Sequence, residues 1–334
     1  MKLTIYSRLR NKIESSELLV PIVYVLTQNK LFRELSYFVA RRRIKEFEKK
    51  KIFGLAIENS CLCNAKCVFC PNTNMKRKKI IMGMDVFSKL VERLKEEKVT
   101  LRFVNLTGTG EPLLDKNIFK KIKILKKEFP EANLFLPTNF SLATKEVIEK
   151  LIDSGLDTIT ISLNADNAAD YKKLMGLDFD KTVSNIENLI KIKKERNSKM
   201  VIMLTIVVND INAENVKGFY EKWSDKVDAM AVNGVHSWGG AVKQYNSKKY
   251  WKIRYACRNL FEQIVVQANG DIVLCCLDYE GTTVGGNVMK DKVMDAFNLG
   301  KIGKIKKMHF NGEVSKIDMC RQCRFSERGM DWLV

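Results

Sequence analysis

Residues 58–72 read ENSCLCNAKCVFCPN and place four cysteines within ten positions. Cys63, Cys67 and Cys70 have the spacing CxxxCxxC, and Cys61 stands outside that pattern. A cubane iron–sulfur cluster has four irons and normally takes four cysteine ligands. Three thiolates on one loop would therefore leave one iron open to bind another group.

Zinc is the competing metal for this loop. A structural zinc site generally closes with four ligands, and the two histidines of the chain, His236 and His309, are far away in the sequence. Cys61 could complete such a site as its fourth ligand. We favour the open cluster, with Cys61 as a packed thiol at the end of the preceding strand.

Short apolar segments alternate with amphipathic segments from residue 51 onward. The expected strands are 53–59, 101–108, 132–138, 156–163, 200–208 and 227–233, and the expected helices are 84–97, 115–129, 144–154, 168–196 and 213–223. Apolar strands in alternation with helices predict a parallel sheet covered by helices. Six such units predict an α/β fold with a partial (β/α)6 TIM-like barrel, and a flat doubly wound sheet is the alternative. In either fold the ligand site lies at the carboxyl ends of the strands.

The character of the chain changes at about residue 246. Residues 262–281, EQIVVQANGDIVLCCLDYEG, contain two strand-like runs around Asn269 and Gly270, which is a strong hairpin signal. The remaining cysteines all lie here: Cys257, Cys275, Cys276, Cys320 and Cys323. We therefore expect three parts: a basic helical N-terminal extension (1–50), the barrel (51–245), and a small cysteine-rich α+β domain organised by metal (246–334).

Composition limits the class of protein. With 334 residues and 46% hydrophobic side chains, the chain can build real cores. No secretory signal is recognisable at the N-terminus, so clustered cysteines point to metal ligands in a cytoplasmic protein. The longest apolar run near the start, residues 18–26, is far shorter than the roughly 20 residues that cross a bilayer.

The formal net charge of +19 favours acidic partners, such as a phosphorylated or otherwise acidic substrate. The lysines recur at helical spacing along the whole chain, however, which is typical of solvated outer faces. The extension at 1–50 could serve as an oligomer contact, a lid or an element that binds a membrane surface. Nucleic acid is not an expected partner, because no RNA-binding module is recognisable.

The loop at 58–72 resembles that of the radical S-adenosylmethionine enzymes, and the resemblance extends over most of residues 51–334. It implies that Cys63, Cys67 and Cys70 hold a [4Fe-4S] cluster. The amino and carboxylate groups of S-adenosylmethionine would chelate the open iron, and Phe69 would lie against the adenine.

A second motif, LTGTGEPLL at residues 106–114, follows the second expected strand. It resembles the family's Gly-Gly-Glu motif, in which the glycines let the backbone approach and the glutamate binds the methionine amino group. By that resemblance Gly108, Thr109, Gly110 and Glu111 contact the cofactor, with Thr109 in place of the usual first glycine.

Two further strand ends are similar to cofactor-facing positions of the family. Thr138 and Asn139 in PTNF resemble its Thr-Asn pair, and Ser162 and Asn164 in ISLNA resemble its Ser-Leu-Asp motif, with an amide in place of the acid. The resemblance places them near the ribose and carboxylate of the cofactor. Taken singly, each polar strand end would also suit a helix cap.

The second cysteine set has the pattern CX12GX4C, from Cys257 to Cys275, followed by a CxxC at Cys320 and Cys323. From the residues alone, zinc and an iron–sulfur cluster remain equal alternatives. The arrangement resembles the twitch form of the SPASM auxiliary domain, which implies one further [4Fe-4S] cluster and two clusters in all. The two-cluster form of that domain would need more cysteines after Cys323. Strand alternation points Cys276 away from Cys275, and we expect a buried structural thiol.

The resemblance implies an enzyme that cleaves S-adenosylmethionine reductively to a 5′-deoxyadenosyl radical, which takes hydrogen from its substrate. The reductant would be a flavodoxin- or ferredoxin-type electron donor. We expect a small polyol, sugar or cyclitol to be oxidised with help from the auxiliary cluster, and His236 and Arg254 are candidate bases. The alternatives are a radical epimerase, a modifier of a ribosomal peptide or nucleic acid, and a non-enzymatic iron–sulfur or zinc scaffold.

Overall fold

The computed structural model describes residues 29–106, 108–242, 255–321 and 323. Its strands are β1 (Ile52–Ile57), β2 (Thr100–Asn105), β3 (Asn133–Thr138), β4 (Thr158–Ser162), β5 (Val201–Val208), β6 (Ala229–Gly234), β7 (Gln263–Val266), β8 (Asp271–Val273) and β9 (Val284–Asn287). Its helices are α3 (Lys30–Lys50), α4 (Met84–Glu96), α5 (Ile118–Glu128), α6 (Lys145–Ile152), α7 (Ala168–Met175), α8 (Phe179–Glu195), α9 (Val216–Trp223), α10 (Arg258–Glu262), α11 (Val293–Asn298) and α12 (Gly300–Phe310).

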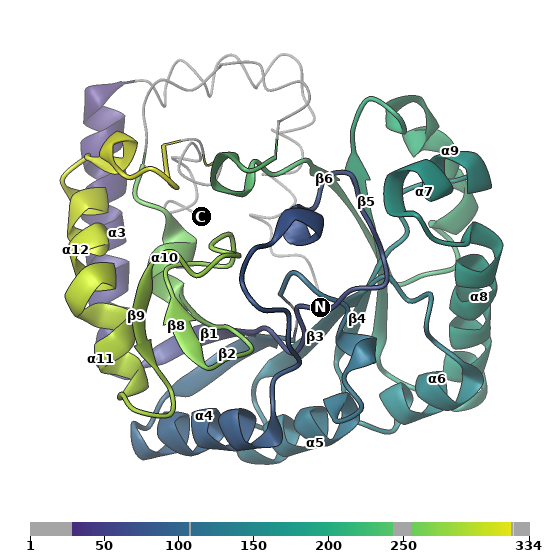
Figure 1. The fold of residues 1–334 in the computed structure, drawn as a ribbon, viewed down its shortest axis with the longest axis horizontal. Coiled ribbons are helices and arrows are strands. Elements are labelled where there is room, and N and C mark those ends of the chain that lie inside the picture. Colours follow the sequence, from purple (N-terminus) through teal and green to yellow (C-terminus); the bar gives the residue numbers. More distant parts are fainter. Residues whose placement is uncertain (1–28, 107, 243–254, 322, 324–334) are drawn as a thin grey trace.

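The strands form one sheet in the order β6-β5-β4-β3-β2-β1-β7-β8-β9. The six strands from β1 to β6 are parallel, and each lies beside the next one in the chain, as in the wall of a singly wound barrel. This order confirms the predicted partial barrel, because a doubly wound sheet would reverse direction at a switch point. In Figure 1 helices α4 to α8 follow the outer rim of the sheet.

The predicted helix at 168–196 is wrong in one respect, because two helices occupy it. Gly176 ends α7 with a left-handed φ of 71°, and its amide donates to the carbonyl of Lys172. The side chain of Asp178 then accepts from the amide of Lys181 and starts α8. A glycine that stops one helix and an aspartate that caps the next are sufficient to break the segment.

The predicted hairpin is confirmed as β7 and β8, with Gly270 at a φ of 88° in the turn. β7 also pairs with β1 in parallel, from Gly54 and Gln263 to Ile57 and Val266. The cysteine-rich region therefore continues the sheet of the barrel, and the loop that follows β1 lies between both parts.

The only part of the N-terminal extension that the structure describes is α3 and the residue before it. Tyr37, Ala40 and Ile44 of this helix are buried against Leu260 and Ile302 of the cysteine-rich region. Figure 1 shows α3 beside α12, so the two ends of the described chain pack together. In the described residues no helix is long and apolar enough to cross a membrane.

Candidate functional site

The loop after β1 is held in place by its backbone. The amides of Lys66 and Val68 donate to the carbonyls of Met175 and Leu174 at the end of α7, at 2.9 and 3.0 Å. Cys67 lies between Lys66 and Val68 in the sequence, and Cys63 and Cys70 lie on either side of them. All three cysteines are partly exposed. Phe69 is half-buried and packs against the main core. The predicted ligands thus stand on a fixed loop at the carboxyl end of β1.

The three thiols share a partly buried environment that favours their neutral form in the absence of a metal. Burial raises the pKa of Cys63 to about 11 and raises the pKa of Cys67 and of Cys70. The Cys70 sulfur adds to the increases at Cys63 and Cys67, so the thiols are close neighbours. Such thiols keep their protons until a metal displaces them.

The arrangement of the thiols bears on the kind of metal. Within the described residues, no three Cys, His, Asp or Glu side chains are arranged to hold a single metal ion. All three donors on the loop are cysteine thiols, a donor type that suits an iron–sulfur cluster.

The loop after β2 packs directly on this cysteine loop. The amide of Glu111 donates to the carbonyl of Leu62 at 2.8 Å. A side chain at Gly110 would overlap the carbonyl of Ser60 and lie 2.6 Å from that of Leu62. Glycine is required here because the two backbones touch.

Replacement of Gly110 by alanine should push the two loops apart. We expect Gly110→Ala to lower the free energy of unfolding by about 1–3 kcal/mol or more, as overpacking does, and to reduce the iron bound on reconstitution. Denaturation midpoints and iron assays measure both effects. Gly218→Ala in α9 is the control, since its new methyl would meet only the Asp166 side chain at 3.1 Å. An unchanged midpoint and iron content in Gly110→Ala would refute the packing argument.

Glu111 brings several predicted residues together. Its buried carboxylate accepts from the Thr138 hydroxyl at 2.6 Å, the Asn139 amide at 2.8 Å and the Leu113 amide at 3.0 Å. The Asn139 side chain donates to Asn64 of the cysteine loop at 2.9 Å. Burial raises the pKa of Glu111, and the three hydrogen bonds oppose the increase. A cation beside this carboxylate would favour its charged form.

Two other residues predicted to contact the cofactor, Thr109 and Asn164, form hydrogen bonds with other residues of the chain. The hydroxyl of Thr109 donates to Glu58 at 3.1 Å. Asn164 is buried with a φ of 52°, and its side-chain oxygen accepts from the Val207 amide at 2.8 Å. Ser162, at the end of β4, is partly exposed. Asn164 thus ties the ends of β4 and β5 together.

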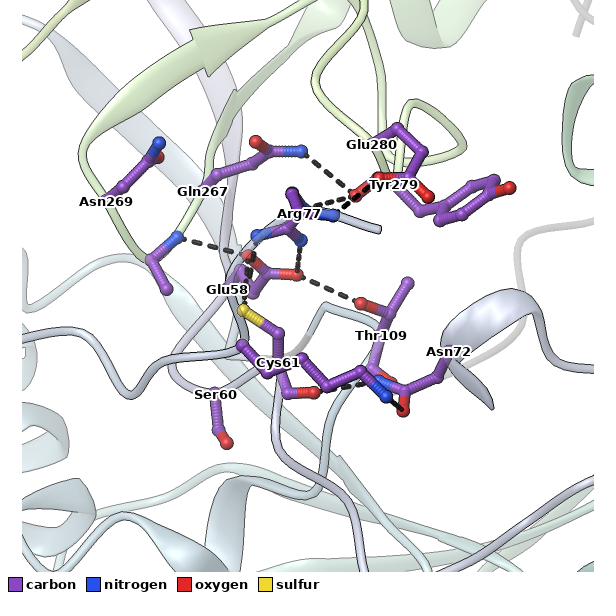
Figure 2. A network of polar contacts seen from close by, with 12 residues as sticks. Glu58, Ser60, Cys61, Asn72, Arg77, Thr109, Gln267, Asn269, Tyr279 and Glu280 are labelled. Carbon is purple, nitrogen blue, oxygen red and sulfur yellow. Dashed lines mark hydrogen bonds and ion pairs between the residues drawn. The ribbon is translucent and has the colours of Figure 1, made fainter. Parts of the chain in front are cut away.

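A network around Glu58 was not predicted from the sequence. Glu58 follows β1, is buried, and forms an ion pair with Arg77 at 2.6 Å. It also accepts from the amide of Ala268, after β7, at 3.1 Å. Figure 2 shows Arg77, Cys61 and Thr109 directed at this carboxylate. The one available sequence signal was an acid at the end of an otherwise apolar strand.

The same network reaches the cysteine-rich region through Arg77. Its side chain donates to the carbonyl of Tyr279, and its own amide and that of Lys76 donate to the Glu280 carboxylate at 3.1 and 2.8 Å. Cys61 is fully buried in this network and accepts from Arg77 at 3.2 Å. The prediction of Cys61 as a packed thiol is confirmed.

The second cysteine set converges on one cavity. Cys257 precedes α10, Cys275 follows β8, and Cys320 and Cys323 come after α12, yet all four line this cavity with apolar side chains such as Leu260. Burial raises the pKa of Cys257 and of Cys275, and the thiols of Cys320 and Cys323 contribute to both increases. None of the nine cysteines, all of which are described, forms a disulfide.

The prediction that Cys276 is a buried thiol is wrong. It was predicted to be buried by strand alternation, but β8 ends at Val273, so alternation does not extend to the turn that holds Cys275 and Cys276. The thiol of Cys276 is exposed and also lines the cavity.

The two histidines occupy different places. His236 is partly buried after β6 and precedes the short helix Trp238–Gly240. Arg254, the other candidate base, lies outside the described residues. His309 lines the cysteine cavity, and burial lowers its pKa to about 4. The sequence offered no signal for this position of His309, because it stands alone on a lysine-rich helix.

Family models match both cysteine-bearing parts of the chain. The model described as the radical SAM superfamily matches residues 60–222, and the SPASM model, described as an iron–sulfur cluster-binding domain, matches residues 257–324.

Curated relatives match the chain over different lengths. The S-adenosyl-L-methionine-dependent 2-deoxy-scyllo-inosamine dehydrogenase of Niallia circulans is 23% identical over 279 residues, which are 82% of this chain and 93% of that protein. A probable GTP 3′,8-cyclase of Saccharolobus islandicus is 28% identical over 183 residues, and the match spans 54% of this chain and 55% of the cyclase.

Solved structures share the fold. BtrN in complex with AdoMet and 2-DOIA superposes with a TM-score of 0.55 and 19% identity, over 82% of this chain and 92% of BtrN. Streptococcus suis SuiB bound to the precursor peptide SuiA gives a TM-score of 0.63 and 16% identity, over 86% of this chain and 74% of SuiB.

Proposed function

Because the chain belongs to the radical S-adenosylmethionine superfamily and carries a SPASM iron–sulfur domain, we propose that it oxidises a small polyol, sugar or cyclitol. The observation that carries this proposal is the match to a cyclitol dehydrogenase over 93% of that relative, whereas the cyclase match spans only about half of either chain. In the proposed division, residues 1–50 are an extension, 51–245 the barrel and 246–334 the auxiliary domain.

The cysteine loop and the β2 loop would bind the cofactor together. S-adenosylmethionine, bound to a [4Fe-4S] cluster and reduced by one electron, supplies a 5′-deoxyadenosyl radical. In our proposal Cys63, Cys67 and Cys70 hold that cluster, and Phe69 contacts the adenine. A one-electron donor of the flavodoxin or ferredoxin type would reduce the site.

Glu111 is suited to receive the cofactor's ammonium group. A carboxylate offers about four lone-pair positions, and its own chain uses three of them through Leu113, Thr138 and Asn139. The remaining position is where an ammonium group could donate to the carboxylate, and a cation there would offset the effect of burial, which raises the pKa of Glu111. We assign Gly108, Thr109, Gly110, Thr138, Asn139, Ser162 and Asn164 to the surrounding wall.

The second cavity would provide for the oxidation. Four of the thiols that line it, those of Cys257, Cys275, Cys320 and Cys323, would suffice for a closed [4Fe-4S] cluster, which would supply an electron acceptor. A substrate carbinol that has lost a hydrogen atom must still lose one electron and one proton to become a carbonyl. We propose His236 or Arg254 as the group that takes the proton.

A radical epimerase is the second candidate, favoured by the exposed thiol of Cys276. A thiol that returns a hydrogen atom to the substrate must be accessible; Cys276 is exposed as a residue, although burial raises the pKa of its thiol to about 11. The two functions differ in outcome, since epimerisation in deuterated water labels the inverted carbon and yields no carbonyl.

The test begins with anaerobic reconstitution and a panel of sugars, polyols and cyclitols, both free and phosphorylated. We expect about eight iron and eight sulfide per chain, and a carbonyl product formed together with one 5′-deoxyadenosine. Solvent deuterium in an unoxidised product would indicate the epimerase instead. If no panel member raises 5′-deoxyadenosine above the uncoupled background, the proposed substrate class is wrong.

Loss of one auxiliary ligand should separate the two sites. We expect Cys320→Ala to lose about four iron per chain and to stop formation of the carbonyl product, while cleavage of S-adenosylmethionine continues. Cys276→Ser should keep the full iron content. Iron assays and product analysis on both variants measure the difference. An unchanged iron content in Cys320→Ala would show that Cys320 is not a ligand of the auxiliary cluster.

A further inference from the structure

His309 joins two parts of the cysteine cavity that are far apart in the chain. It is fully buried at the end of α12. Its Nδ1 accepts from the backbone amide of Cys257 at 3.2 Å, and its Nε2 lies 3.4 Å from the sulfur of Cys320. One imidazole ring therefore contacts two of the four residues that we assign to the auxiliary cluster.

The contact with Cys257 determines the tautomer of the ring. A backbone amide can only donate, so Nδ1 must present its lone pair. A neutral imidazole carries one proton, which then resides on Nε2 and points at Cys320. When Cys320 is a thiolate it is the acceptor of this hydrogen bond.

This tautomer excludes His309 as a metal ligand. A histidine that bound a metal through Nε2 would carry its proton on Nδ1 and could not accept from the Cys257 amide. The N–H of Nδ1 would then face the N–H of Cys257 across the 3.2 Å contact, and no hydrogen bond could form. The ring stands beside the cluster site as a hydrogen-bond donor.

We propose that His309 is a positioning residue that sets the reduction potential of the auxiliary cluster, an inference that rests on the proposed function. Hydrogen bonds to cysteine sulfurs are among the determinants of cluster potentials. A reduced cluster carries one more negative charge than an oxidised one, so a donor at Cys320 stabilises the reduced form more and raises the potential. A higher potential favours uptake of an electron from the substrate.

Two conservative variants separate the two contacts of the ring. His309→Asn places an amide oxygen near the Nδ1 position and keeps an acceptor for Cys257, but it loses the donor to Cys320. His309→Gln places an amide NH2 near the Nε2 position and keeps that donor. Both retain a polar side chain, so the pair remains informative if a bulkier change such as His309→Phe fails to fold.

The experiment is a redox titration of the reconstituted full-length chain, followed by electron paramagnetic resonance. We expect His309→Asn to shift the reduction equilibrium of the auxiliary cluster against the reduced form by up to about tenfold, which is about 59 mV for a one-electron couple. His309→Gln should lie between Asn and the parent. Cleavage of S-adenosylmethionine should be unchanged in both variants.

The outcomes distinguish this inference from the proposed function. About eight iron per chain with equal potentials in the parent and His309→Asn overturns the role of His309 and leaves the auxiliary cluster in place. About four iron in the parent overturns both, because no auxiliary cluster would then exist.

Discussion

Cys67→Ala is expected to abolish reductive cleavage of S-adenosylmethionine and to lower the iron content by about four atoms per chain. Cys67 is the central thiol of the CxxxCxxC loop, and its raised pKa reflects burial and the neighbouring sulfurs of Cys70 and Cys63. Two remaining thiolates cannot hold a cubane in place. The measurement is the yield of 5′-deoxyadenosine and methionine with dithionite as reductant, together with iron and sulfide assays.

Two other cysteines serve as controls for this result. Cys276→Ser, at an exposed thiol outside the loop, should keep both the iron content and the cleavage. Cys61→Ala tests the zinc alternative, in which Cys61 would be a ligand; we expect it to retain the cluster, since its thiol contacts Arg77 and Glu58. Cleavage that survives in Cys67→Ala would exclude the loop as the cofactor site.

Arg77→Met is expected to destabilise the folded chain by on the order of 3 kcal/mol. The change leaves the carboxylate of Glu58, which is only 5% exposed, without its cationic partner. It also removes the donor to the Tyr279 carbonyl, one of the contacts between the cysteine loop and the auxiliary region. Urea denaturation of the reconstituted chain, followed by circular dichroism, measures the loss.

A double-mutant cycle separates the ion pair from its surroundings. The double variant Glu58→Gln with Arg77→Met should be more stable than the sum of the single losses predicts, because no unpaired charge stays buried. Lys150→Ala is the matched control: it removes an exposed pair with Glu146, and we expect a change of less than about 0.5 kcal/mol. Equal effects of Arg77→Met and Lys150→Ala would show that the buried pair has no special weight.

The strands of the barrel could be predicted because they are short runs of mostly apolar residues. β1 and β4 are buried at nearly every position, whereas β3 alternates, with Leu134 and Leu136 completely buried and Phe135 partly exposed. The break between α7 and α8 was missed, although Gly176 and Asp178 are ordinary stop and start signals. The amphipathic pattern continues across that break, so the periodicity of the apolar residues predicted one helix in spite of the local stop and start signals.

The cysteines of the candidate site could be predicted, whereas the residues that position them could not. Cys63, Cys67 and Cys70 lie close together in the sequence, so their spacing alone identifies them as a set of ligands. Glu58 and His309 act through contacts with Ala268 and Cys257, which lie 210 and 52 positions away. Only the fold brings such pairs together, and a single sequence carries no record of the pairing.

The most direct test of the central claim is an electron paramagnetic resonance spectrum of the reduced, reconstituted protein with and without S-adenosylmethionine. The claim is that Cys63, Cys67 and Cys70 hold an open cluster while the second cavity holds a closed one. We predict that one signal changes when the cofactor is added and is missing in Cys67→Ala, and that a second signal stays unchanged. A spectrum in which no signal responds to the cofactor, or in which Cys67→Ala keeps the responsive signal, would contradict the account.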